Sequence, residues 1–459
     1  MNGTPLNDLP YTRNIRSTTM STPPAVQLGE KKPIPPDTSR RVAFAAFVGT
    51  AMEWYDFFLF TTAAALVFNV QYFSSENALT ATMASFSTLA VGFVARPVGG
   101  LLFGWLGDRV GRKKILMTTI VGIGISTVLI GLLPNYYSIG VIAPIALVVL
   151  RILQGLAVGG EWSGAVTIAA ECASPSQRAR YASIPQLGSP VGTIMSSGAF
   201  FITAAVLSED VFNSWGWRIP FLLALPLLGV SVVIRKQLEE SPEFEALQKQ
   251  DSVSEAPLRQ VFSGAWRQLL VGASVMFIGT GGFYLMTTFV ISYGKRALDL
   301  SATMLLLATV IAAVVQLPVI ISGGRLGTRF GSSRVVLGGA IATIVLAFPL
   351  FWAISTAQPV LVVIAMTVGV AAISYPYAVS GAVLTSLFPA KVRYSGVSVS
   401  SNIAGMAAGF VPLIATAVLT VTGDTLWPAA VILVLIGVIA LVGAIITPRW
   451  SVAEAGLKH

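Results

Sequence analysis

Five charged residues lie in stretches of sequence that are otherwise apolar. They are Glu53 and Asp56 (within 42–68), Arg96 (within 82–105), and Arg151 and Glu161 (within 139–168). Burial raises the pKa of a carboxylate and a neighbouring guanidinium lowers it, so an acid beside an arginine can exchange a proton when its surroundings change. A guanidinium binds a carboxylate through two parallel hydrogen bonds. The residue types therefore suit proton exchange and the binding of an acidic solute.

The acids are the candidates for proton exchange. Glu53 and Asp56 are spaced i,i+3, which places both on one face of a helix. We predict that at least one acid among Glu53, Asp56 and Glu161 takes up a coupling proton. Arg151 is the predicted partner cation. The only histidine is His459 at the C-terminus, so no imidazole is available in an apolar segment. The alternative is that these charges form static pairs that fix helix packing.

The arginines and several polar side chains are candidates for substrate binding. Arg96 and Arg151 are the predicted contacts of an anionic substrate. Aromatic and amide side chains in apolar segments are predicted to complete the site. The set is Tyr55, Gln154, Tyr284, Tyr375 and Asn402, with Trp54, Gln316 and Tyr377 as weaker members of the same kind. The competing interpretation of each is helix packing or a position at the membrane surface.

Composition indicates the kind of element that positions these residues. The chain has 459 residues, of which 54% are hydrophobic and 11% charged, with a mean hydropathy of +0.78. Soluble domains average about 25% charged residues, so this composition excludes a cytosolic enzyme, a coiled coil and a disordered chain. The net charge of +9 does not indicate nucleic acid, because the basic residues lie between apolar segments. We predict a polytopic membrane protein.

Twelve apolar segments are candidates to cross a bilayer, which takes about 20 residues of helix each. They are 42–68, 82–105, 115–133, 139–168, 181–207, 217–235, 268–293, 302–322, 333–354, 359–387, 395–421 and 426–447. Their apolar runs are continuous rather than alternating, which predicts helices and not barrel strands. With both termini inside, 24 of the 29 Lys and Arg residues lie on the cytoplasmic side. The positive-inside rule therefore predicts cytoplasmic N- and C-termini.

The longest charged segment between these apolar segments divides them into six and six. The predicted units are a disordered cytoplasmic tail (1–40), an N-terminal six-helix bundle (41–235), a cytoplasmic linker (236–266), a C-terminal six-helix bundle (267–447) and a short cytoplasmic tail (448–459). An internal repeat supports the division, because GWLGDRVGRKK (104–114) recurs as GRLGTRFGSSR (324–334). Such repeats are typical of transporters whose substrate site lies between two halves.

The sequence lacks the usual signatures of catalysis and of cofactor binding. It contains no GxxxxGK[ST] phosphate loop, so ATP is not expected to drive the protein directly. Cys172 is the only cysteine, which excludes a metal site built from several cysteines. The run GGEWSG (159–164) lacks the GxSxG spacing of a nucleophile elbow. We therefore predict that the chain is not an enzyme and holds neither a cofactor nor a metal.

Several motifs resemble one transporter family. GDRVGRKK (107–114) and RILQG (151–155) resemble signatures of the major facilitator superfamily. Further segments resemble its metabolite:proton symporter family, namely EWYDFF (53–58), GFVARPVGG (92–100), GGEWSGA (159–165), SWGWRIPF (214–221) and LEESPEF (238–244). Within that family, TAAALVFN (62–69) and GLLPNYYSIG (131–140) are most similar to the shikimate-transporter-like branch.

The resemblance implies an all-α membrane protein with twelve transmembrane helices in two six-helix bundles related by pseudo-twofold symmetry. It implies a monomer in a bacterial plasma (inner) membrane that imports a small organic acid with protons. The substrates of the family include shikimate, dicarboxylates and 2-oxoglutarate. The lipid bilayer is a further expected partner, whereas nucleic acid is not.

The resemblance also assigns a gating loop to residues Gly107, Asp108, Arg109, Gly111 and Arg112. In the second copy of this loop Thr328 replaces the acid and Ser332 replaces the last arginine. Only the first loop can therefore form the full set of charged contacts. The competing interpretation is that its basic residues serve membrane topology alone.

Two alternatives to proton-coupled import of an acid stay open. The first is an uncoupled facilitator on the same scaffold, whose uptake would not respond to a protonophore. The second is a proton symporter of a zwitterion such as proline or betaine, because an acid pair among aromatic rings also suits a quaternary ammonium.

Overall fold

The computed structural model describes residues 36–73, 78–110, 112–159, 161–171, 173, 175–236, 262, 264–389, 393–423 and 425–450. Within these ranges some side chains, including those of 104–117 and Glu161, are outside the described set. The described residues are almost all helical and contain no strand. The all-helical prediction is therefore confirmed for this part of the chain.

The first group of helices follows the N-terminal part of the sequence. Its members are α1 (Pro36–Leu66), α2 (Phe68–Gln71), α3 (Ala78–Val110), α4 (Arg112–Leu132), α5 (Tyr136–Ile139), α6 (Ile142–Val158), α7 (Glu161–Glu171), α8 (Arg178–Gln186), α9 (Gly188–Val206), α10 (Glu209–Ser214), α11 (Ile219–Leu222) and α12 (Ala224–Lys236). In this group α1 packs on α9, α3 on α6, and α4 on both α6 and α12. We call it the N-terminal half.

The second group follows the C-terminal part of the sequence. Its members are α15 (Trp266–Tyr284), a π-helical turn (Leu285–Phe289), α16 (Val290–Ala297), α17 (Ala302–Phe330), α18 (Ser332–Ser355), α19 (Pro359–Leu387), α20 (Arg393–Thr422) and α21 (Trp427–Trp450). Here α18 packs on α19 and α21, and α15 packs on α20. We call it the C-terminal half.

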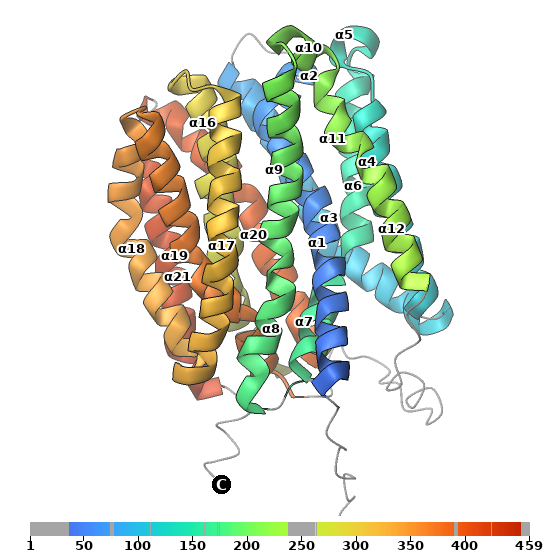
Figure 1. Cartoon of the computed structure of the whole chain (residues 1–459), viewed down its shortest axis with the longest axis vertical. Helices are drawn as coiled ribbons and strands as arrows, with labels where there is room; N and C mark the ends of the chain where they lie inside the picture. The colour runs from blue at the N-terminus through green and yellow to red at the C-terminus, as the bar shows by residue number, and fades with distance from the viewer. Residues whose placement is uncertain are drawn as a thin grey trace, which may run out of the picture.

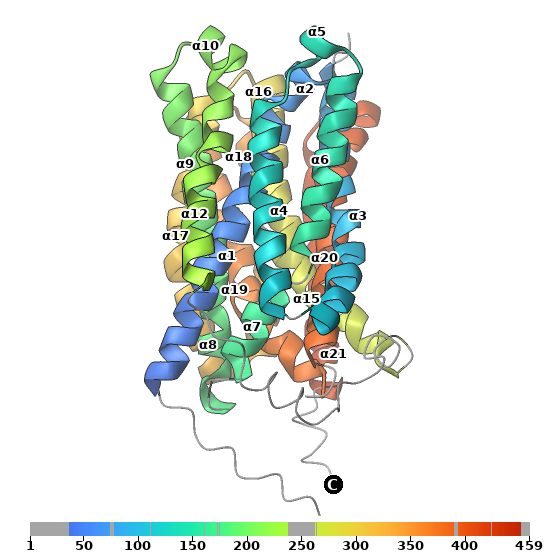
Figure 2. The same ribbon diagram turned by 90° about the vertical axis from the view of Figure 1, so that its right-hand side faces the viewer.

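The two halves lie side by side with their long helices nearly parallel (Figure 1). They meet where α3 packs on α20, α9 on α17, and α8 on both α17 and α19. Helix α1 begins and α21 ends at the same end of the molecule, which is the lower end in Figures 1 and 2. We call this the terminal end. Helices α7 and α8 lie there, and α5 and α10 lie at the opposite end (Figure 2).

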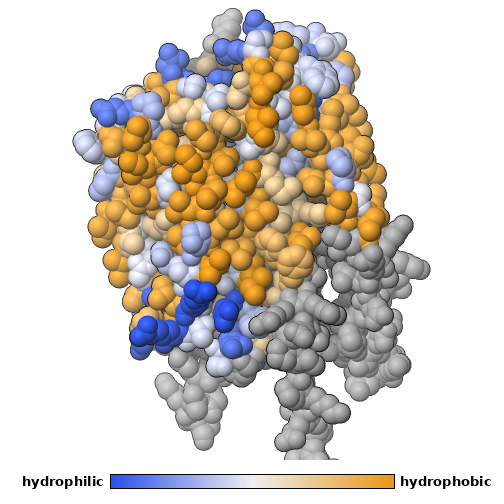
Figure 3. Space-filling view, viewed as in Figure 1, coloured by the Kyte–Doolittle hydropathy of each residue, from blue (hydrophilic) through white to orange (hydrophobic). Residues whose placement is uncertain are grey.

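Eight helical segments of the described chain are long and apolar enough to cross a membrane. One of them lies in α3. The other seven lie in the part of the chain from α8 to α21. Helix α1 is not among the eight, and its apolar run is interrupted by Glu53 and Asp56. On the face shown in Figure 3, the described surface is hydrophobic over its middle and carries its hydrophilic residues mostly near the two ends. This pattern suits a belt of lipid around the helices.

Some predicted boundaries differ from the helices observed. Helix α1 begins at Pro36, inside the predicted tail, and proline is favoured in the first turn of a helix. The segment 139–168, predicted as one span, is divided into α6 and α7 after the C-cap residue Gly159. The segment 181–207 is likewise divided into α8 and α9 at Leu187. Residues 1–35 and most of the linker 236–266 lie outside the described residues.

Glycines allow α3 and α6 to cross at backbone contact. A Cβ at Gly155 would overlap the carbonyl oxygen of Gly92, and one at Gly99 would overlap the carbonyl oxygen of Leu156. Small residues permit this close approach. In a membrane, apolar surface is buried equally well against lipid and against protein, so helices associate mainly through close packing. The crossing brings Arg151, on α6, into the interior of the N-terminal half.

We expect the substitution Gly155→Ala to lower the thermal stability of the purified protein. The added methyl group collides with backbone rather than with a movable side chain, and such overpacking costs about 1–3 kcal/mol. Gly198→Ala on α9 is the matched control, because a Cβ there meets nothing within 4 Å. The control should leave the melting temperature unchanged or raise it, since alanine favours helix by about 1 kcal/mol over glycine. Equal effects of both substitutions would contradict the assigned crossing.

Candidate functional site

A network of buried polar side chains joins α1, α4 and α6. Asp56, Gln154 and Arg151 are exposed by only 7%, 1% and 3%. Arg151 Nη1 donates to Gln154 Oε1 at 2.5 Å, and Gln154 Nε2 donates to Asp56 Oδ2 at 2.7 Å. The hydroxyl of Thr127 donates to Asp56 Oδ1 and lies 2.9 Å from Gln154 Nε2. Gln154 therefore stands between the cation and the carboxylate and contacts both.

Aromatic rings surround the two arginines on their other sides. The guanidinium of Arg151 lies 4.0 Å from the ring centroid of Phe60, and that of Arg96 lies 4.6 Å from the ring centroid of Phe93. The ring of Phe57 is within 6 Å of both guanidinium groups, at 5.8 and 5.0 Å. Cation–π attraction of this kind gains strength where water is excluded. The rings thus stabilise both guanidinium groups inside the protein.

Gly92 provides the space for the guanidinium of Arg151. A Cβ at this position on α3 would overlap the Nε atom of Arg151. That Nε atom is buried and makes no hydrogen bond within the described part of the chain. The hydrogen bonding of Arg151 in this conformation is therefore directed at Gln154.

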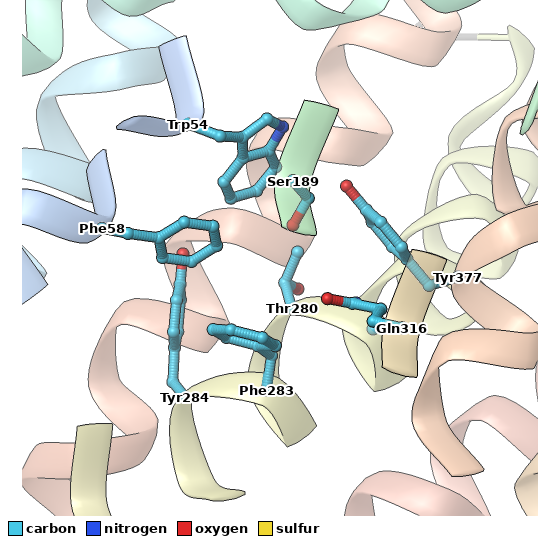
Figure 4. A pocket seen from close by; sticks show the side chains of 9 residues that line it. Trp54, Phe58, Ser189, Thr280, Phe283, Tyr284, Gln316 and Tyr377 are labelled. Atoms are coloured by element: carbon cyan, nitrogen blue, oxygen red, sulfur yellow. The ribbon is translucent and has the colours of Figure 1, made fainter. Parts of the chain in front are cut away.

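A cavity lies between the two halves, about midway along the long helices. In this conformation it is narrow, with a volume of about 10 Å³, which is room for about one water molecule. Its walls come from α1, α9, α15, α17 and α19, so both halves contribute. The residues that line it are Trp54, Phe58, Ser189, Gly279, Thr280, Phe283, Tyr284, Gln316 and Tyr377 (Figure 4). Neither an arginine nor a lysine is among these described lining residues.

Several polar atoms of the lining have no partner in the described structure. Trp54 Nε1, Tyr284 Oη and Gln316 Oε1 are buried and make no hydrogen bond. The hydroxyl of Tyr377 also makes none, although it points toward Ser189 (Figure 4). A buried polar group without a hydrogen bond costs about 1–3 kcal/mol. Donors and acceptors of a polar solute would satisfy these groups once the cavity widens, so the cavity is a candidate binding site.

Aromatic pairs connect the halves beside the cavity. The rings of Phe58 and Phe283 have centroids 4.9 Å apart, and those of Phe57 and Tyr284 are 5.3 Å apart. Phe57 therefore contacts both the arginines of the network and a residue of the cavity wall. Glu53, which is also buried, interacts electrostatically with the hydroxyls of Tyr284 and Tyr377.

The structure separates the predicted residues into groups. Asp56, Arg151 and Gln154 belong to one network, Arg96 lies beside it, and Tyr284 lines the cavity. Glu53 lies near the cavity wall. The side chain of Glu161 is outside the described set, as are those of Asp108, Arg109 and Arg112 and the whole of Gly111. Gly107 belongs to the helical end of α3.

Three predicted residues are directed elsewhere. The hydroxyl of Tyr55 donates to the carbonyl oxygen of Pro220 at 2.6 Å, within the N-terminal half. Tyr375 is half-buried on α19 and packs near Gly323 of α17. Asn402 donates to the carbonyl oxygen of Gly159 at 3.2 Å and so joins α20 to the end of α6. None of the three lines the cavity, because the helix face that carries each of them turns away from it.

Some residues of the site were not predicted from the sequence. Thr127 donates a hydrogen bond to Asp56. The cavity is lined by Ser189, Thr280, Phe58 and Phe283. Threonine, serine and phenylalanine are common in membrane helices, so their types alone carry little signal. Phe58 has a positional signal, because it follows Trp54 by four residues and therefore shares its helix face.

A family profile described as "Sugar (and other) transporter" matches residues 42–265. The inner membrane metabolite transport protein YhjE of Escherichia coli is 36% identical over 397 residues, which are 84% of this chain and 89% of that protein. The shikimate transporter of Escherichia coli is 36% identical over 409 residues, covering 87% of this chain and 92% of the relative. The proline/betaine transporter of Salmonella typhimurium is 33% identical and covers 92% and 85%.

Solved structures show the same fold at lower identity. A D-xylose-proton symporter superimposes with a TM-score of 0.68 and 18% identity, covering 90% of this chain and 98% of the other. A partially occluded inward-open conformation of the xylose transporter XylE from Escherichia coli gives a TM-score of 0.65 with the same identity. At this identity the likeness concerns the fold.

The different surroundings of two tyrosine hydroxyls give opposite expectations for their removal. Tyr55→Phe removes the hydrogen bond to Pro220 and leaves that carbonyl oxygen without its partner, which costs about 1–3 kcal/mol. Tyr284→Phe removes a buried hydroxyl that makes no hydrogen bond in this conformation. Thermal unfolding should therefore show a lowered melting temperature for Tyr55→Phe and an unchanged or raised one for Tyr284→Phe. The reverse order would contradict the hydrogen bonding described above.

Proposed function

Because the chain belongs to the major facilitator superfamily, in the branch of the shikimate transporter, we propose that it imports a small organic acid together with protons. It is a membrane transporter and not an enzyme. The observation that carries the proposal is the cavity between the halves, whose unpaired polar atoms adjoin the network of Asp56, Gln154 and Arg151. Shikimate, 2-oxoglutarate and dicarboxylates are the acids to test.

We propose twelve membrane spans in two six-helix bundles related by pseudo-twofold symmetry. Eight of the spans are those that length and hydropathy identify, and the other four are α1 and three shorter apolar stretches, Thr118–Leu132, Ile142–Val158 and Gly216–Val230. The repeated segments support the symmetry, because α3 ends at Val110 and α17 ends 220 residues later at Phe330. The proposed monomer lies in a bacterial inner membrane with its terminal end in the cytoplasm, as the positive-inside rule favours.

Asp56 is the proposed site of proton exchange that the described contacts support best. Its two oxygens accept hydrogen bonds from Thr127 and Gln154, and Gln154 connects it to Arg151. Protonation of Asp56 would remove the negative charge that faces Arg151, which changes the interaction between α1 and α6. Glu53 and Glu161 remain candidates for the same step, and the loop Gly107–Arg112 remains the proposed cytoplasmic gate.

Neutral donors are the proposed direct contacts of the acid. Trp54 Nε1 and the hydroxyls of Tyr284 and Tyr377 can each donate to a carboxylate or hydroxyl oxygen. Arg96 and Arg151 interact electrostatically with Tyr284, so they add a positive potential on that side of the cavity. In this conformation the two arginines therefore act on the acid only through their positive charge. Direct contact between an arginine and the acid would need a rearrangement of the site.

A zwitterion such as betaine or proline is the second candidate substrate. The observation in its favour is the aromatic lining, in which Trp54, Phe58 and Phe283 present rings to a cavity near Glu53. Ring faces together with a carboxylate suit a quaternary ammonium. An uncoupled facilitator is the remaining alternative, and only a transport measurement separates it from a symporter.

Uptake into proteoliposomes under an inward proton gradient tests the function. We expect one labelled acid to accumulate, by about tenfold per pH unit for each proton carried, since both gradients have the same energy per tenfold ratio. A protonophore should abolish the accumulation. Equilibration without accumulation in tight vesicles would establish a facilitator, and accumulation of betaine alone would establish the second candidate.

Asp56→Asn should abolish accumulation while exchange of labelled for unlabelled substrate continues, because asparagine keeps the hydrogen bonds of a neutral acid but cannot release a proton. Asp210→Asn on the exposed helix α10 is the matched control and should accumulate substrate normally. Normal accumulation by Asp56→Asn would show that another acid carries the coupling proton.

Glu53→Gln separates the two substrate classes. It should lower the affinity for betaine if the carboxylate balances a quaternary ammonium, and it should maintain or raise the affinity for an acid, because a negative charge near the cavity is removed. Binding of each solute to the purified variant, measured by calorimetry, checks the direction.

A further inference from the structure

A buried glutamine joins the two halves directly beside the cavity. Gln186 at the end of α8 has no exposed surface. Its Nε2 donates to the carbonyl oxygen of Tyr377 at 2.9 Å and to Ser380 Oγ at 3.0 Å, both on α19. Its Oε1 accepts from Trp162 Nε1 of α7 at 3.1 Å. One side chain therefore uses its donors across the interface and its acceptor within its own half.

The partners of Gln186 are also parts of the cavity wall or its neighbours. The residue whose carbonyl oxygen accepts from Gln186, Tyr377, lines the cavity with its ring and hydroxyl. Ser189, three residues after Gln186, lines the cavity from the other half. Any movement of α19 away from α8 must therefore break the bonds of Gln186 and displace the hydroxyl of Tyr377.

Close packing surrounds this contact toward the terminal end. A Cβ at Gly324 of α17 would overlap Ser183 Oγ of α8, and one at Gly381 of α19 would overlap Cγ1 of Val166 on α7. Side chains added there would force the halves apart. The described parts of the two halves are thus in close contact on the terminal side of the cavity, and Gln186, like Asn402, provides directional hydrogen bonds between the halves.

We propose that Gln186 is a positioning residue that couples the cavity to opening of the terminal end. It holds the backbone of α19 at Tyr377, so that the tyrosine hydroxyl faces the cavity while the terminal end is closed. When that end opens, the amide exchanges its bonds to α19 for bonds to water, and Tyr377 leaves its position. This inference rests on the proposed transport function, with a substrate site that opens alternately to the two sides of the membrane, and concerns opening toward the terminal end.

Distances between spin labels across the terminal end test the proposal without a substrate. The labels replace exposed Gln177 and Arg329, which lie on the N-terminal and the C-terminal half, in a Cys172→Ser background. Gln186→Met keeps a similar volume but removes all three hydrogen bonds. We expect the ratio of open to closed molecules to rise about tenfold, because two net hydrogen bonds across the interface are lost. The apparent affinity for substrate offered from the opposite end should fall in proportion to the loss of closed molecules, and so by at most tenfold.

Two further variants keep the test specific. Ser380→Ala removes one acceptor and leaves the glutamine, so it should cause a smaller shift in the same direction. Gln71→Met is the matched control, because Gln71 is a buried glutamine that donates to the carbonyl oxygen of Asn213 and accepts from Asn135, all within the N-terminal half. It should not change the distances. An unchanged distribution for Gln186→Met, or an equal shift for Gln71→Met, would overturn the proposal. Because the distances require neither solute nor proton gradient, failure of the uptake assay would not affect this result.

Discussion

A buried arginine and a buried aspartate that must be satisfied inside one helix bundle impose the central constraint on this structure. Either charge alone would cost several kcal/mol in the apolar interior. Arg151, Gln154, Thr127 and Asp56 hydrogen-bond to one another only if α1, α4 and α6 stay in one register.

The same register fixes the opposite face of α1. Trp54 and Phe58 flank Asp56 at two residues on either side, and their shared face is turned toward the cavity. The charge network and the cavity thus depend on a single helix.

The two halves have unequal parts in this arrangement. The N-terminal half contains the buried charges, and the C-terminal half contributes neutral groups such as Gln316 and Tyr377 to the cavity. Phe57 connects the two regions, since its ring lies near both guanidinium groups and contacts Tyr284. A change in charge at Asp56 can therefore reach the cavity through a short chain of packed rings.

The sequence predicted the helical fold and singled out three residues of the network, although not their contacts with one another, for a physical reason. Asp56, Arg151 and Gln154 are rare residue types in apolar segments, and their burial requires partners. It could not distinguish Tyr55 from Tyr377, because the direction of a hydroxyl depends on which helices pack around it. The hydroxyl of Tyr55 donates to a carbonyl oxygen of α11, whereas Tyr377 lines the cavity. Breaks such as the one after Gly159 were also not predicted, because hydropathy is continuous across them. The role of Gln186 follows only from the contact of α8 with α19.

The unpaired polar atoms of the cavity have a consequence for evolution. Trp54, Tyr284 and Gln316 direct groups into the cavity that no structural hydrogen bond requires. A replacement that keeps the packed ring or volume and changes only the polar atom therefore removes little folding stability, while the network that holds the helices in register lies outside the cavity lining. Selection can alter the recognised solute by single substitutions without first finding compensating mutations. A scaffold divided in this way is readily diversified after gene duplication. This separation accounts physically for relatives with one fold that are named for solutes as different as shikimate and betaine.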